Sequence, residues 1–94
     1  MYIRSQDGLY IVPLTFASIS IHNNIIHVTP FTGSSIRVGE YDSQEICRKV
    51  VDEIEERINR ATTDNFVYRM PSRESMREIV EMDKVMAMLD KNII

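Results

Sequence analysis

The sequence predicts an α+β fold, in which an antiparallel β-sheet meander is followed by a helix, a short strand and a second helix. Two observations lead to this prediction. Residues 1–42 carry only five charged side chains and divide into short apolar segments separated by turn residues, whereas the other twenty charges lie in residues 43–94. In that charged half, apolar residues recur every three or four positions, which is typical of amphipathic helices.

The length and composition favour one globular domain over residues 1–94. A chain of 94 residues buries only roughly two-thirds of its unfolded surface, so a partner would add to its stability. The net charge of -3 argues against bulk attraction to nucleic acid or to an anionic membrane. No apolar run approaches the length of a transmembrane helix, and Arg4 and Asp7 interrupt any early apolar stretch, so we expect neither a membrane span nor a signal peptide. The single cysteine makes the cytoplasm the default location.

The β-sheet is predicted over residues 1–41. Residues 1–6 and 9–14 form an opening hairpin around Asp7-Gly8, because a two-residue Asp-Gly loop between apolar segments favours a type I′ turn. Pro13 cannot donate a hydrogen bond, so the second strand is an edge strand or ends there.

Three more strands complete the predicted meander, at residues 17–22, 25–30 and 34–41. Asn23-Asn24 forms the first turn between them, since asparagine tolerates positive φ, and Thr32-Gly33 forms the second. Five short strands joined by tight turns are typical of an antiparallel sheet.

The first helix is predicted over residues 42–61. Asp42 is expected to be its N-cap, with Glu45 three residues later completing a capping box and Tyr41 and Ile46 forming a hydrophobic staple. One apolar stripe follows, made by Cys47, Val50, Val51, Ile54, Ile58 and Ala61. Residues 62–65 are read as a loop.

A short strand over residues 66–70 ends at Pro71, and Ser72 is expected to cap a second helix over residues 72–92. The apolar set of this helix is wider than one packing face requires, as the following residues show: Met76, Ile79, Val80, Met82, Val85, Met86, Met88, Leu89 and Ile93. Such a helix packs on two partners, so we expect a homo-oligomer, a dimer or a multiple of one, with Met82, Met86 and Leu89 at its interface. The alternative is that these methionines simply fill a core.

The sequence contains no recognisable catalytic or metal-binding motif. His22 and His27 flank a turn with no third ligand nearby, which favours structural histidines over a metal site. Cys47 lies on an apolar stripe without a visible base and is expected to be buried and unreactive. Acidic pairs such as Glu55-Glu56 lie on a solvated helix face rather than in a pocket. We therefore expect no enzyme, no metal and no cofactor.

Arginines within the β segments are the candidate binding residues. Arg4, Arg37 and Arg69 interrupt apolar strand patterns, and a guanidinium binds phosphate and stacks on bases. The alternative is three arginines on an exposed sheet face. Arg69 also lies close to the start of the second helix, whose free N–H groups favour anions, and Met70 could cover a base. The full candidate set for a small nucleotide ligand is Arg69, Met70, Arg37, Arg4, Tyr68 and Phe31.

Four segments carry a resemblance to a known group of proteins: YIRSQDG from Tyr2, VGEYDS from Val38, the helix ICRKVVDEI from Ile46, and VYRMP from Val67. Together they resemble small proteins of prophages and mobile elements in Gram-positive bacteria, over residues 1–71. The layout is also similar to the Thoeris anti-defence sponges, oligomers that sequester cyclic ADP-ribose signals. That resemblance implies a ligand pocket lined by an Arg-Met pair, which Arg69-Met70 would match.

The resemblance implies a phage counter-defence protein that binds and sequesters a small cyclic nucleotide signal of the cyclic ADP-ribose type without turning it over. A second hypothesis is a protein-binding inhibitor or accessory regulator from a mobile element, which would work through acidic faces of its helices. A ligand site would require convergent arginines, whereas an inhibitor of a nucleic-acid enzyme would show a continuous acidic surface.

Overall fold

A computed structural model describes residues 1–61 and 66–92 of the chain, and the predicted loop at 62–65 and Ile93 lie outside these residues. The order of elements is that of an α+β fold, as predicted. In chain order the elements are β1 (Tyr2–Arg4), β2 (Ile11–Pro13), β3 (Ala17–His22), β4 (Ile25–Pro30), β5 (Ile36–Glu40), α1 (Gln44–Arg60), β6 (Val67–Arg69) and α2 (Arg73–Asn92).

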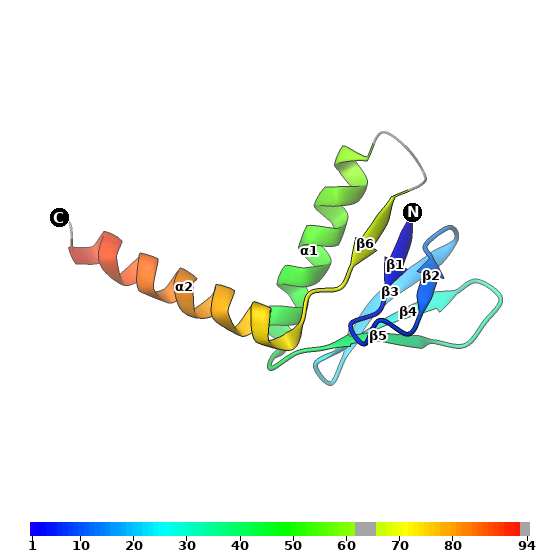
Figure 1. Cartoon of the computed structure of the whole chain (residues 1–94), viewed down its shortest axis with the longest axis horizontal. Helices are drawn as coiled ribbons and strands as arrows, with labels where there is room; N and C mark the ends of the chain where they lie inside the picture. The colour runs from blue at the N-terminus through cyan, green and yellow to red at the C-terminus, as the bar shows by residue number, and fades with distance from the viewer. Residues whose placement is uncertain (62–65, 93–94) are drawn as a thin grey trace.

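The strands form two three-stranded sheets, where the sequence suggested one meander. The order is β2-β1-β6 in the first sheet and β3-β4-β5 in the second (Figure 1). β6 pairs with β1 in parallel, with Tyr2 opposite Val67 and Arg4 opposite Arg69, so the first sheet is mixed. Parallel strands cannot be joined by a tight turn and need a long connection, which β2 to β5 and α1 supply between β1 and β6.

The predicted type I′ loop at Asp7-Gly8 is wrong, although the hairpin itself is present. Among the described residues with positive φ, Gly8 appears at 76° and Asp7 does not, whereas a type I′ turn needs both. The Asp7 carboxylate accepts hydrogen bonds from the Ser5 hydroxyl (2.6 Å) and the Leu9 N–H (2.9 Å). These bonds lower the pKa of Asp7. The aspartate thus orders a longer loop through its side chain.

The turn between β3 and β4 has the predicted geometry. Asn23 and Asn24 have φ of 52° and 63°, the left-handed pair that a two-residue hairpin loop requires. His22 is therefore opposite Ile25, and His27 pairs with Ser20, so the two histidines do not face each other.

The core lies between the inner faces of the sheets and α1. Ile3 and Val12 come from the first sheet, Ile26 and Val28 from the second. The apolar stripe of α1 supplies Ile46, Cys47, Val50 and Ile54, as the three-and-four spacing predicted. Ile58 is 46% exposed, so the apolar stripe of α1 extends one helical turn beyond the buried core.

The N-cap of α1 is Ser43, and the prediction of Asp42 in that role is wrong. The Ser43 hydroxyl accepts from the Ile46 N–H at 3.2 Å. Asp42 instead binds α2, accepting from Arg73 Nε at 2.5 Å and from Arg77 Nε at 2.6 Å. Two guanidinium partners hold a carboxylate more strongly than helix N–H groups do, because the hydrogen bonds are charge-assisted.

Helix α2 projects away from the rest of the molecule (Figure 1). Its start is fixed by the Ser72 hydroxyl, which accepts from the Ser75 N–H at 3.0 Å, as predicted for the cap. Met76 is buried and Val80 is half-buried, but the large apolar residues farther along are exposed. The exposed set is Ile79, Met82, Val85, Met86, Met88 and Leu89.

Burial of Cys47 leads to the first prediction. Its side chain has no exposed surface, and burial raises the pKa of the thiol. Because the thiolate is the reactive form, we expect negligible labelling by a disulfide reagent in native buffer and full labelling in denaturant. Rapid labelling without denaturant would contradict the packing of α1 described above.

The Asp42 contacts lead to a pH-dependent prediction. Hydrogen bonds from Arg77 and Arg73 hold the pKa of the Asp42 carboxyl well below its usual range. A depressed pKa stabilises the fold above the ordinary aspartate pKa of about 3.9, and that stabilisation is lost as the pH falls below it. We expect Asp42→Asn to lower the melting temperature at pH 7, with the difference from wild type shrinking below about pH 4. Asp52→Asn, on the exposed face of α1, serves as the control; an equal loss for both variants would argue against the contact.

Candidate functional site

The solvent face of the β2-β1-β6 sheet carries two of the predicted arginines side by side. Residues alternate along β1 and β6, so Ile3 and Tyr68 point into the core while Arg4 and Arg69 point outward. Arg4 is the register partner of both Arg69 and Ile11, which places the three in one row across the sheet. The neighbouring row is Pro13, Tyr2 and Val67. We call these six residues the arginine face.

The two guanidinium groups of the arginine face lack a carboxylate partner among the described residues. Arg4 donates from Nη2 to the Gly8 carbonyl at 3.1 Å, which orients the group without neutralising it. Arg69 is exposed, and within residues 1–61 and 66–89 no side-chain hydrogen bond or ion pair is found for it. Adjacent strands lie about 4.8 Å apart, and like charges directly opposite each other are destabilising. An anion bound between the two guanidinium groups would attract both of them and so offset their mutual repulsion.

Apolar surface surrounds the two charges. Tyr2 is 39% exposed, Ile11 58% and Val67 43%, all on the same side of the sheet. An exposed aromatic ring and two aliphatic side chains beside paired guanidinium groups suit a ligand with an anionic part and a flat apolar part.

Tyr68 and Met70 do not join this face. They are 5% and 6% exposed and belong to the core. Met70 Cε would lie 3.0 Å from a Cβ at Gly39, so the absence of a side chain there lets the methionine pack closely. Burial raises the pKa of the Tyr68 hydroxyl, with Glu53 adding to the effect. In one chain, then, Met70 has no free surface with which to cover a base beside Arg69.

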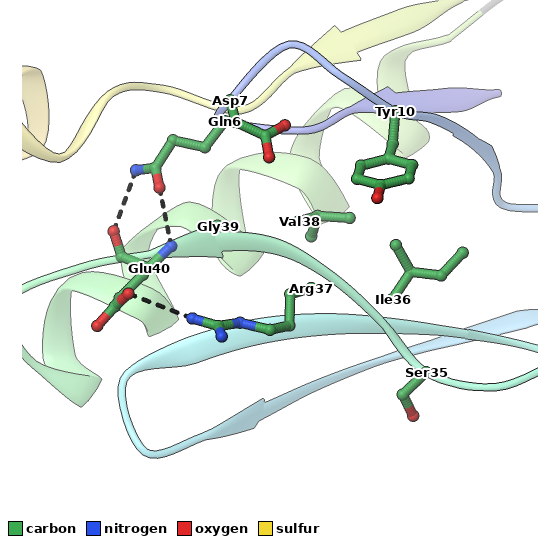
Figure 2. A pocket seen from close by; sticks show the side chains of 9 residues that line it. All are labelled: Gln6, Asp7, Tyr10, Ser35, Ile36, Arg37, Val38, Gly39 and Glu40. Atoms are coloured by element: carbon green, nitrogen blue, oxygen red, sulfur yellow. Dashed lines mark hydrogen bonds and ion pairs between the residues drawn. The ribbon is translucent and has the colours of Figure 1, made fainter.

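Arg37 lies in a separate cleft, between β5 and the loop that joins β1 to β2. The cleft has a volume of about 540 Å³, within the range of small-molecule sites. Figure 2 shows the Tyr10 ring on one wall, above Ile36 and Val38. Arg37 Nη2 lies 3.3 Å from Glu40 Oε2, so its charge is already paired.

The charge of the cleft disfavours an anionic ligand. Asp7 and Glu40 contribute two carboxylates against the single guanidinium of Arg37. A phosphate entering the cleft would have to displace Glu40 from Arg37 and would meet Asp7 as well. Of the two arginine positions, the arginine face is thus the more favourable for phosphate.

A shallow hollow of about 370 Å³ borders the other edge of β6. Arg69, Val67 and Tyr68 line it together with Glu53 and Arg57 of α1. Arg57 Nη2 is 3.8 Å from Glu53 Oε1, so this pair contributes no net charge. The hollow gives a bound ligand room to extend past Arg69 toward α1.

Phe31, the remaining predicted residue, is 87% exposed in the loop between β4 and β5. It shares neither the cleft nor the hollow with the arginines. Of the six predicted ligand residues, the arginine face therefore brings together only Arg4 and Arg69, and the hollow brings Tyr68 to Arg69. Sequence reasoning missed Tyr10 and Gln6 as cleft residues. Residues in loops follow no regular hydrophobic pattern, so the sequence does not indicate the direction in which their side chains point.

No family model, curated protein or solved structure matches the chain. Among the described residues, no group of three or more His, Cys, Asp and Glu side chains is arranged to hold a metal ion. Neither helix, over the part of the chain that the structure describes, is long and apolar enough to cross a membrane.

Proposed function

We propose that this chain is a non-enzymatic binding protein that sequesters a small phosphorylated nucleotide of the cyclic ADP-ribose type in the bacterial cytoplasm. The observation that supports the proposal best is the register pair of Arg4 and Arg69 on the arginine face. A pyrophosphate supplies two adjacent anionic groups, one for each guanidinium, and arginine binds phosphate through planar, bidentate hydrogen bonds.

The rest of the arginine face suits the remainder of such a ligand. Tyr2 offers an aromatic surface on which a base can stack, and Ile11 and Val67 exclude water from the contact. No group on the face is placed as a nucleophile or as a general acid or base, so binding without turnover is the activity proposed. A protein of this kind would act in phage counter-defence by removing a signal from solution.

Self-association through α2 is part of the proposal. Ile79, Met82, Met86 and Leu89 are spaced by three, four and three residues, the a/d pattern of a helix-helix seam. All four are between 48% and 66% exposed in the single chain. Pairing with α2 of a second copy would bury this seam.

Loss of either facing arginine is expected to weaken ligand binding. Arg69→Ala and Arg4→Ala should each reduce the affinity for cyclic ADP-ribose isomers by about 1.5–3 kcal/mol, the range for a hydrogen bond to a charged group. Titration calorimetry measures the effect, with inorganic pyrophosphate as a probe for the anionic part alone.

Two controls make this experiment decisive. Arg48→Ala, on the solvated face of α1, should leave the affinity unchanged. Arg37→Ala distinguishes the cleft from the arginine face: a loss with this variant and none with Arg69→Ala would move the site to the cleft. If the wild type binds no nucleotide tested, the protein-binding regulator becomes the better hypothesis.

Charge introduced into the α2 seam should reduce the mass of the assembly. We expect Met82→Glu with Met86→Glu to shift the light-scattering mass to a smaller species without unfolding, because both side chains are exposed in the single chain. Arg48→Glu, on the face of α1 opposite its apolar stripe, is the matched control. A wild type that is monomeric at every working concentration would contradict the α2 assembly.

A further inference from the structure

Two phenylalanines are exposed at the end of the β3-β4 hairpin farthest from its turn. Phe16 is 85% exposed and Phe31 is 87% exposed. The last register pair of this hairpin is Ala17 with Pro30, so Phe16 and Phe31 lie directly beyond it, one next to the end of each strand. We call the end of the hairpin that carries these two residues the tip. It lies at the end of the long axis opposite to the C-terminal part of α2 (Figure 1).

The backbone at Phe16 is strained. Its φ is 55°, in the left-handed region that a bulky side chain rarely adopts. The Ala17 N–H donates to the Leu14 carbonyl at 3.2 Å, which makes Phe16 the third residue of a turn, a position where glycine or asparagine is usual when φ is positive. Strain of this kind is typical of functional positions, and here almost no intramolecular contact of the ring offsets it.

The segments that form the tip carry no charged side chain; the amino group of Met1, whose carbonyl accepts from the Leu14 N–H at 3.0 Å, lies nearby. Residues 8–36 contain no Asp, Glu, Lys or Arg. Anionic membranes are recognised by several basic residues next to apolar ones, and a strongly charged protein partner would find no charged side chain in residues 8–36 to pair with. A second copy of this chain meets neither difficulty: the molecule has a net charge of -3, and two copies repel each other least where their surfaces are uncharged.

We infer that the tip is an interface between two copies of the chain, in which the Phe16 and Phe31 rings of one copy pack on those of the other. In the usual dimer interface the same surface patch of both copies meets across a two-fold axis, so each copy contributes the same residues. Aromatic side chains bury about 150–250 Å² each, so two rings supply roughly half of the ~800 Å² per partner of a standard interface. The half-buried Leu14 and Pro30 lie beside them and extend the surface.

The tip would be a second interface in addition to the one formed by α2. The larger assembly described next rests on the self-association through α2 that is part of the proposed function. Two self-complementary surfaces at opposite ends of a molecule build assemblies larger than a dimer. With both interfaces intact the wild type contains at least four copies. Disruption of one leaves dimers held by the other.

The test is light scattering on Phe16→Asn with Phe31→Asn. Asparagine tolerates the positive φ at position 16, so the variant keeps the turn and loses only the rings. We expect the mass to fall to a dimer, and to a monomer when Met82→Glu and Met86→Glu are added. Protection of the Cys47 thiol reports in each variant that the core is intact. Leu9→Asn is the matched control, since Leu9 is 77% exposed in the same uncharged segment but away from the tip.

The outcomes separate the two interfaces. A wild-type dimer that becomes a monomer with the tip variant supports the tip and removes the α2 contact. A tip variant that keeps the wild-type mass at all concentrations overturns the inference, as does an equal loss of mass with Leu9→Asn. Nucleotide binding by Arg4 and Arg69 is measured in a separate experiment. If no nucleotide binds, the conclusions drawn from the light-scattering masses still hold.

Discussion

Polar contacts between the two sheets converge on Gln6, and the placement of both candidate sites depends on them. Its backbone N–H donates to the Val38 carbonyl at 2.7 Å. Its side-chain amide donates to the Glu40 carbonyl and accepts from the Glu40 N–H, both at 3.0 Å (Figure 2). The amide also donates to the Pro71 carbonyl at 3.3 Å, and Tyr41 Oη donates to the same oxygen at 2.7 Å. One residue therefore fixes the β1-β2 loop against β5 and against the start of α2.

The division of the arginines between two places follows from this arrangement. Docking of the β1-β2 loop on β5 creates the cleft that contains Arg37, and it leaves the opposite surface of the first sheet open. Arg4 lies on that open surface because alternation along β1 sends Ile3 into the core. Arg69 joins it because β6 pairs with β1 in the register that aligns the two arginines. The charge pair is thus a product of strand register, which also brings apolar Tyr2 and Val67 beside it.

The elements of the fold could be predicted from sequence, whereas the site depends on pairings that local patterns do not contain. The three-and-four spacing of α1 identified Val50 and Ile54 as core residues, because that pattern reports a single buried face. Asp42 was misassigned because a capping signal and an ion pair with a helix thirty residues away use the same carboxylate. The parallel partner of β1 could not be foreseen, since sixty residues separate the strands and no local spacing records their register. Arg69 was chosen for its residue type, its place before the second helix and the Arg-Met pair of the resemblance, but only that register gives it Arg4 as a neighbour.

The parallel pairing of β1 with β6 also sets the order in which the two sheets can fold. The β3-β4-β5 sheet is joined by short turns, so its pairing closes small loops at low entropic cost. The first sheet instead joins Tyr2 to Val67, about two-thirds of the chain apart, and its closure must wait until that later segment has been synthesised. Until then one side of β1 presents unpaired backbone groups, the kind of edge at which strands of other molecules can add. The sheet that carries the arginine face is therefore the later of the two sheets to be assembled, and it forms only on a chain that has been synthesised through β6.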